Sequence, residues 1–167
     1  LRPRLKAYCE TLRVSHRKAF SDAAPGEEIV LAALEDKAQM QALLHGVDAV
    51  VHMGGVSTEK SWESILAGNI VGMVNLYEAA RANGVKRIVF ASSNHVTGFY
   101  RQDEVITPQD PVRPDGFYGL SKAFGEKHAL VITGGDARGL ARALDQAAIR
   151  FPHLWARGKD RPTIDDV

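Results

Sequence analysis

The sequence predicts an α/β fold with a doubly wound parallel sheet, in which helices cover both faces. Short runs of apolar, β-branched residues alternate along the chain with segments whose apolar residues recur at helical spacing. The runs are nearly continuously apolar, as in strands of a parallel sheet that is buried on both sides. Two of them end in glycine or polar residues, at the strand ends where such sheets bind ligands.

The first third of the chain is expected to contain two helices and three strands. Residues 2–10 have the pattern of the end of a helix, and residues 11–16 and 28–34 are strand candidates on either side of a loop with a Pro-Gly pair. Residues 36–45 carry apolar side chains at helical spacing, followed by a glycine that ends the helix. Residues 47–55 form the third strand, which ends in two glycines.

The middle of the chain begins with a long predicted helix at residues 61–83, with an interruption expected at one of its two glycines. Residues 85–93 are the most strand-like run of the sequence. A loop at residues 101–116, which holds three prolines, leads to a predicted helix at residues 117–130. Alternation of this kind indicates strands joined by helical crossovers.

Size and composition indicate one domain with an ordinary core. The chain has 167 residues, 45% hydrophobic and 25% charged, with a formal net charge of +1. This balance gives no electrostatic reason to expect nucleic acid or an anionic membrane surface as a partner. No apolar run reaches the length of a membrane span. The single cysteine, Cys9, cannot form an internal disulfide and fits a cytoplasmic location.

Tyr118 and Lys122 are the first candidates for catalysis, because they lie four residues apart in a predicted helix and share one face. A free tyrosine is a poor base at neutral pH, but a nearby cation favours the phenolate. The pair can therefore accept a proton from a substrate hydroxyl, with Ser93 as a further hydrogen-bonding group. A solvated helix face is the simpler explanation of the pair alone.

Four consecutive polar residues, Ser92, Ser93, Asn94 and His95, follow the strand at 85–93. Each has a simpler explanation as a turn residue or a surface histidine. Likewise Ser57 could cap the helix that follows it, and Gly54 and Gly55 could form a plain turn. Both segments nevertheless leave the carboxyl ends of predicted parallel strands, so they are expected to face one crevice. The histidines show no paired metal-ligand spacing, so no metal site is expected.

Together, the strand "RIVFASSNHVTG", the helix "NIVGMVNLYEAARANGV" and the segment "YGLSKAFGE" resemble the extended short-chain dehydrogenases/reductases of the NAD-dependent epimerase/dehydratase family. Within that family, "VHMGGVSTEKSWESILAGNIVGMVNLYEAA" and "ASSNHVTGFY" are most similar to the uronate dehydrogenase group. The resemblance covers roughly residues 1–129 and implies a Rossmann-like fold. It also implies that the family's first strand and Gly-rich phosphate-binding turn precede Leu1. On this interpretation residues 1–130 form a partial NAD(P)-binding domain. The tail, 131–167, is unrecognised, with a helix expected at 138–150.

The resemblance implies a role for each matching position. Tyr118 would be the general base, Lys122 its partner and a ligand of the nicotinamide ribose, and Ser93 the group that binds the reacting hydroxyl. The expected set of substrate-binding residues is Ser57, Ser93, Asn94 and His95. The expected set of cofactor-binding residues is His16, Met53, Gly54, Gly55, Asn69, Ser92, Tyr118 and Lys122. His16 stands where relatives usually carry an acidic residue, and two basic residues follow it, so NADP is an alternative to NAD.

The implied reaction is the NAD-dependent oxidation of a hexuronic acid, galacturonate or glucuronate, at C1 to an aldarolactone. Because the Gly-rich turn is not in the sequence, the chain by itself is expected to be an incomplete, inactive piece of such an enzyme. A nucleotide-sugar epimerase or dehydratase of the same family is the first alternative, and a non-catalytic degenerate fragment the second. A homo-oligomer is expected only by resemblance, since the helices at 61–83 and 115–130 pair in many relatives.

Overall fold

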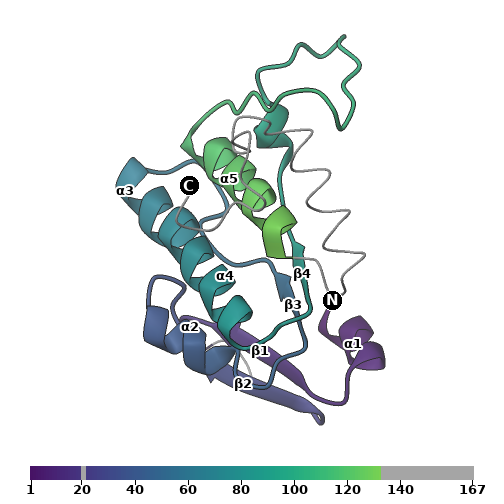
Figure 1. The fold of residues 1–167 in the computed structure, drawn as a ribbon, viewed down its shortest axis with the longest axis vertical. Helices are drawn as coiled ribbons and strands as arrows, with labels where there is room; N and C mark the ends of the chain where they lie inside the picture. Colours follow the sequence, from purple (N-terminus) through teal and green to yellow (C-terminus); the bar gives the residue numbers. More distant parts are fainter. Residues whose placement is uncertain (20–21, 133–167) are drawn as a thin grey trace, which may run out of the picture.

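The computed structural model describes residues 1–19 and 22–132, with side chains through residue 126 (Figure 1). The strands are β1 (Leu12–His16), β2 (Glu27–Leu31), β3 (Ala49–His52) and β4 (Arg87–Phe90). The α-helices are α1 (Arg2–Leu5), α2 (Lys37–Leu43), α3 (Trp62–Ile65), α4 (Gly72–Ala82) and α5 (Phe117–Ile132). Shorter helical segments are the 3-10 helices η1 (Lys6–Tyr8) and η3 (Asn94–Thr97) and the π-helical η2 (Leu66–Val71). The expected alternation of strands and helices is confirmed, and the predicted helix at 138–150 lies outside the described residues.

The strands pair in parallel, as predicted, but they form two separate pairs within the described part of the chain. β1 pairs with β2, with Val14 opposite Ile29, and β3 pairs with β4, with Val51 opposite Val89. Among the described residues, the predicted parallel sheet is represented by these two pairs.

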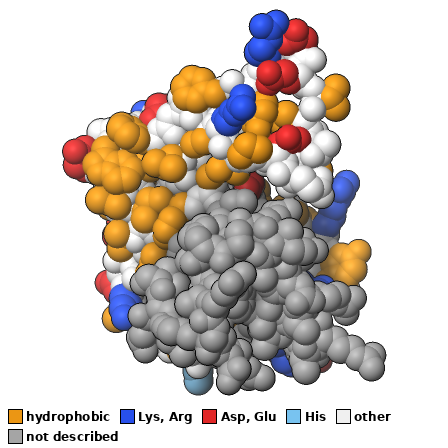
Figure 2. All heavy atoms as spheres, turned by 45° about the horizontal axis from the view of Figure 1, so that its top comes forward, with side chains coloured by type: hydrophobic (Ala, Val, Ile, Leu, Met, Phe, Trp, Pro, Cys, Tyr) orange, Lys and Arg blue, Asp and Glu red, His pale blue; other side chains and the backbone are white. Residues whose placement is uncertain are grey.

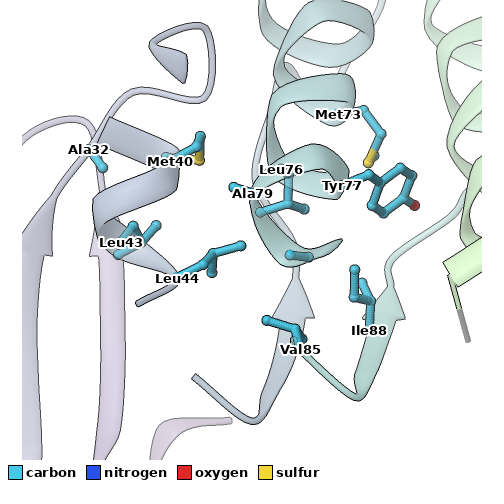
Figure 3. Close-up of a cluster of buried hydrophobic side chains, with 11 residues drawn as sticks. Ala32, Met40, Leu43, Leu44, Met73, Leu76, Tyr77, Ala79, Val85 and Ile88 are labelled. Carbon is cyan, nitrogen blue, oxygen red and sulfur yellow. The ribbon is translucent and has the colours of Figure 1, made fainter. Parts of the chain in front are cut away.

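The core lies between these strands and the helices α2 and α4, which pack against each other (Figure 3). Met40, Leu43 and Leu44 come from the α2 segment, and α4 contributes Leu76 and Tyr77 among others. Their spacing of three or four residues gives each helix one apolar face. Burying side chains of this size stabilises the fold by about 1.5–3 kcal/mol each. On the other face of the β3–β4 pair, Val51 and Val89 remain 42% and 53% exposed.

The long helix is continuous but irregular, which agrees with the predicted interruption. The chain passes from α3 through the π-helical η2 directly into α4, and Gly68 and Gly72 lie at and beside this change. At Gly72 a Cβ atom would lie 2.7 Å from the Cβ of Leu34, so the absence of a side chain allows α4 to approach the loop after β2. π-Helical turns are rare and frequently occur at functional sites.

The proline-containing loop at 101–116 projects from one end of the molecule (Figure 1). Its base is closed by backbone hydrogen bonds from Phe99 N to Arg113 O, 3.0 Å, and from Arg113 N to Val96 O, 2.9 Å. Charged side chains of both signs gather at its tip (Figure 2). Within the loop, Arg101 and Asp103 form an exposed ion pair. The loop is therefore anchored at its base, next to η3 and the start of α5.

Candidate active site

The candidate site begins where β3 and β4 end side by side. His52 is opposite Phe90 in the register, and Ala91 N donates to His52 O at 3.0 Å. The chain therefore leaves both strands at the same edge, with Met53, Gly54 and Gly55 after β3 and Ser92 and Ser93 after β4. The expectation that these two polar segments start from one edge is confirmed.

Helix α5 brings Tyr118 and Lys122 to this edge. Both side chains are buried, with exposures of 9% and 7%. Lys122 Nζ donates to Ala91 O at 2.9 Å and lies 5.6 Å from the centroid of the Tyr118 ring. Burial lowers the pKa of Lys122. Its ammonium is thus held between the end of β4 and the tyrosine ring, where a cation favours the phenolate.

The polar segment after β4 forms η3 and touches Tyr118. Ser93 caps η3, because its Oγ accepts from His95 N at 3.3 Å, and it lies 3.4 Å from Asn94 Oδ1. The His95 ring meets the Tyr118 ring edge-on, with centroids 5.5 Å apart. Ser93 therefore caps η3, the segment whose His95 contacts Tyr118.

Asn69, in η2, ties the loop after β3 to α5. Its Oδ1 accepts from Val56 N at 2.7 Å, and its Nδ2 donates to Val56 O at 3.0 Å and to Ser121 Oγ at 2.8 Å. Ser121 in turn donates to Tyr118 O at 2.7 Å. Gly55 has φ +103°, and a Cβ there would lie 2.5 Å from Asn69 Oδ1, so glycine is needed on both counts. Both N–H groups of the Asn69 amide and one lone pair of its oxygen are used in these bonds, so Asn69 positions this loop.

The first turn of α5 is capped by Glu59, a residue from the loop after β3. Its carboxylate accepts from Phe117 N at 3.1 Å and from Tyr118 N at 2.9 Å. A carboxylate at a helix N-terminus satisfies N–H groups that have no partner in the helix and interacts favourably with the helix dipole. The loop after β3 is therefore attached to η2 at Val56 and to α5 at Glu59, on either side of Ser57.

The other expected site residues make no side-chain hydrogen bond with Tyr118, Lys122 or His95 among the described residues. Ser57 and Met53 are exposed, and Ser57 makes no side-chain hydrogen bond with the described residues. The residue that precedes α3 is Ser61, so Ser57 is not its cap. Ser92 is exposed and donates to Glu126 of α5. His16 ends β1, in the other strand pair, and its Nδ1 lies 3.1 Å from Lys18 N and 2.9 Å from Lys18 O.

Sequence reasoning missed Glu59, Asp115, Ser121 and Glu126, which hold the expected residues in place. Ser121 could have been found, since it lies three residues after Tyr118 and within the same helical segment. Glu59 has no local signal, because its partners are 58 and 59 residues away in the chain. No group of metal-ligating side chains occurs among the residues whose placement is described. Within the same residues no helix has the length and apolarity to cross a bilayer.

Comparison with known proteins gives matches over most of the chain. The model of the NAD dependent epimerase/dehydratase family matches residues 3–158, which extends past residue 129. A uronate dehydrogenase of Pseudomonas putida is 57% identical over 127 residues, which is 75% of this chain and 47% of that protein.

Solved structures give the same relationship. The crystal structure of uronate dehydrogenase from Agrobacterium tumefaciens has a TM-score of 0.75 and 51% identity, covering 78% of this chain and 49% of that one. A mutant of the same enzyme, complexed with NAD, has a TM-score of 0.76 and 48% identity, with coverages of 83% and 52%. The chain spans about half the length of the curated relatives it matches. With its α/β fold and the extent of the family match, the chain belongs to the NAD dependent epimerase/dehydratase family.

Proposed function

We propose that the protein oxidises a hexuronic acid at C1 with NAD⁺ and yields an aldarolactone. The observation that carries the proposal is the buried Lys122 ammonium, bonded to Ala91 O beside the ring of Tyr118. Ser93 and His95 lie at the same strand end. The relatives named uronate dehydrogenase, at 49–57% identity, support the substrate class.

The residues of this chain handle the proton of the reaction. Tyr118, as phenolate, takes the proton of the C1 hydroxyl, and the Lys122 cation stabilises that phenolate. Ser93 holds the same oxygen while it becomes a carbonyl oxygen. When bound, NAD⁺ supplies the acceptor for the hydride that leaves C1. Among the described residues the Tyr118 hydroxyl has no hydrogen-bond partner, so it is available to a substrate.

The cofactor fits the residues at the strand ends. Lys122 Nζ uses one of its three donors on Ala91 O, which leaves donors for the hydroxyls of a ribose and for Tyr118. Gly54 and Gly55 leave the end of β3 without side chains, so a dinucleotide can approach the backbone there. His16, Met53, Asn69 and Ser92 remain proposed cofactor contacts. The basic residues that follow His16 make NADP the alternative, and a solved relative is complexed with NAD.

The substrate is proposed to lie against Ser57, Ser93, Asn94 and His95. Ser57 is exposed between the two attachment points of its loop, and His95 lies edge-on to the Tyr118 ring. Asn94 is also exposed at the start of η3. Hydroxyl, amide and imidazole groups together suit a polyhydroxylated sugar acid, which presents many donors and acceptors.

The test uses the protein as its gene encodes it. Galacturonate, glucuronate and UDP-sugars are supplied with NAD⁺ or NADP⁺. The absorbance of the reduced cofactor follows a net oxidation, and separation of the sugar products follows epimerisation or dehydration, in which the cofactor is re-oxidised in each turnover. Oxidation of free uronates with NAD⁺ is expected, together with an increase in lactone. The Tyr118→Phe variant should lose at least about 100-fold in kcat, the size of a general-base contribution. Turnover of UDP-sugars without turnover of uronates would identify an epimerase or dehydratase instead, and failure to bind any dinucleotide would indicate a non-catalytic chain.

Self-association is proposed along α3, η2, α4 and α5. Exposed apolar side chains lie on these elements, and two of them, Trp62 and Phe117, pack against each other with centroids 5.2 Å apart. The others are Leu66, Val71, Val74 and Leu120. Exposed apolar surface of this extent is typical of interaction sites. Light scattering of the wild type and of Leu66→Glu should give the mass of a dimer and of a monomer, respectively. Equal masses would exclude this surface as the site of self-association.

A cytoplasmic location is also proposed, supported by the free, exposed Cys9.

A further inference from the structure

His95 is held by a carboxylate from a distant part of the chain. Its Nδ1 lies 2.8 Å from Asp115 Oδ2 and 3.0 Å from Asp115 Oδ1. Asp115 stands in the segment just before α5, 20 residues away in sequence. The side chain of His95 is 51% exposed and that of Asp115 31%. Among the described residues, Nε2 of His95 has no hydrogen-bond partner, so the ring is fixed at one nitrogen only.

The position of the Asp115 carboxylate is set by its backbone and by two glycines. Asp115 N donates to His95 O at 3.3 Å, which pairs the two residues a second time. A Cβ atom at Gly98 would overlap the carboxylate, lying 2.8 Å from Asp115 Cβ. At Gly119 it would overlap the His95 carbonyl and lie 3.2 Å from Asp115 Oδ1. The carboxylate thus occupies space that side chains at these two positions would fill.

A carboxylate oxygen only accepts hydrogen bonds, so the proton of this contact must be on Nδ1 of His95. In a neutral imidazole the other nitrogen, Nε2, then carries a lone pair and is an acceptor. The ring is also in edge contact with Tyr118, the proposed general base. An acceptor nitrogen is therefore presented beside the residue that is expected to take the substrate proton.

We propose that Asp115 is a positioning residue that fixes His95 with its proton on Nδ1, so that Nε2 accepts a hydrogen bond from a hydroxyl of the sugar. The proposal rests on the proposed function for the identity of the ligand. In this proposal His95 binds a hydroxyl of the uronate and does not bind its carboxylate. An ionised carboxylate has no proton to donate to Nε2, and it would face the charge of Asp115 as well.

The test combines a spectroscopic and a kinetic measurement on the wild type and on Asp115→Asn. Long-range ¹⁵N–¹H NMR of the imidazole rings reports which nitrogen carries the proton, and a His95→Gln variant identifies the His95 signals among the six histidines. Above the pH at which the ring becomes neutral, the wild type should show the proton on Nδ1. An asparagine amide can donate to Nδ1, so Asp115→Asn should move the proton to Nε2, as occurs in hydrolase triads whose aspartate is replaced.

Kinetics then test the role of Nε2. Asp115→Asn should raise KM for the uronate about 10-fold and change kcat by less than about 3-fold, since one substrate hydrogen bond is lost and the base is unchanged. Asp103→Asn, at an exposed position of the proline-containing loop, is the matched control and should leave the ring and KM unaltered. A wild-type ring protonated on Nε2 would overturn the proposal. If NMR shows the expected tautomer but Asp115→Asn leaves KM unchanged, or the wild type does not turn over uronates, the contact between Asp115 and His95 stands. The assignment of a sugar hydroxyl to Nε2 is then wrong.

Discussion

Replacing Asn69 by alanine should destabilise the chain more than any other single truncation in the long helix outside its apolar face. Its side chain makes three hydrogen bonds, two to the backbone of Val56 and one to Ser121 Oγ. Each is worth about 1 kcal/mol, so their loss costs about 3 kcal/mol. In a chain of this size 1 kcal/mol lowers Tm by about 2–4 °C, so a decrease of about 6–12 °C is expected.

The helix offers a matched control in Asn75. It is buried as Asn69 is, and among the residues whose placement is described its side chain makes one hydrogen bond, from Nδ2 to Leu34 O at 3.0 Å. Asn75→Ala should therefore cost about 1 kcal/mol, or about 2–4 °C. Asn69→Asp adds a second comparison. A carboxylate can still accept from Val56 N, but its other oxygen opposes Val56 O, so it should be no more stable than the alanine variant.

Thermal unfolding followed by circular dichroism measures all of these variants. The reasoning requires that the decrease in Tm for Asn69→Ala be about three times that for Asn75→Ala. Equal decreases would show that the hydrogen bonds of Asn69 to Val56 and Ser121 contribute nothing beyond a single buried amide bond. The loop after β3 would then not depend on Asn69.

Three further changes have expected outcomes. Gly119→Ala places a Cβ 2.9 Å from the carbonyl carbon of His95, so the free energy of unfolding should fall by about 1–3 kcal/mol. Gly68→Ala should cost less, because its nearest neighbours are a methyl group of Val56 at 3.2 Å and the backbone N of Val56 at 3.9 Å. Glu59→Gln removes the charge at the N-terminus of α5 and should lower stability by about 1–2 kcal/mol in urea titrations, an effect that Glu59→Asp with a shorter reach would only partly restore. Burial, and secondarily a nearby lysine, lower the pKa of His52 from 6.5 to about 4. The unfolded state therefore binds a proton first, and stability should fall by about 3 kcal/mol as pH falls from about 6.5 to 4, a slope that His52→Gln should remove.

The local patterns were informative because helix and strand periods are short. The face shared by Tyr118 and Lys122 needs only the four-residue spacing of a helix, and the structure has both residues in α5 and both buried. Polar residues after two parallel strands must leave the same edge, as the register of His52 and Phe90 confirms. The element ends were less accurate, since Ser92 and Ser93 lie beyond β4, whose last residue is Phe90. Strand ends depend on pairing, which the sequence of one strand does not contain.

The sequence by itself determined the alternation of elements, the pairing of Tyr118 with Lys122 and the place of the polar residues, because each follows from periodicity or chain direction. Only the tertiary structure decided which residues hold them in place. Glu59 caps the first turn of α5, Asn69 donates a hydrogen bond to Ser121, and Asp115 contacts His95. These partners are 59, 52 and 20 residues apart, and a hydrogen bond between distant side chains leaves no periodic mark in the sequence. Which strands pair was decided there as well, since pairing joins residues that are far apart in the sequence.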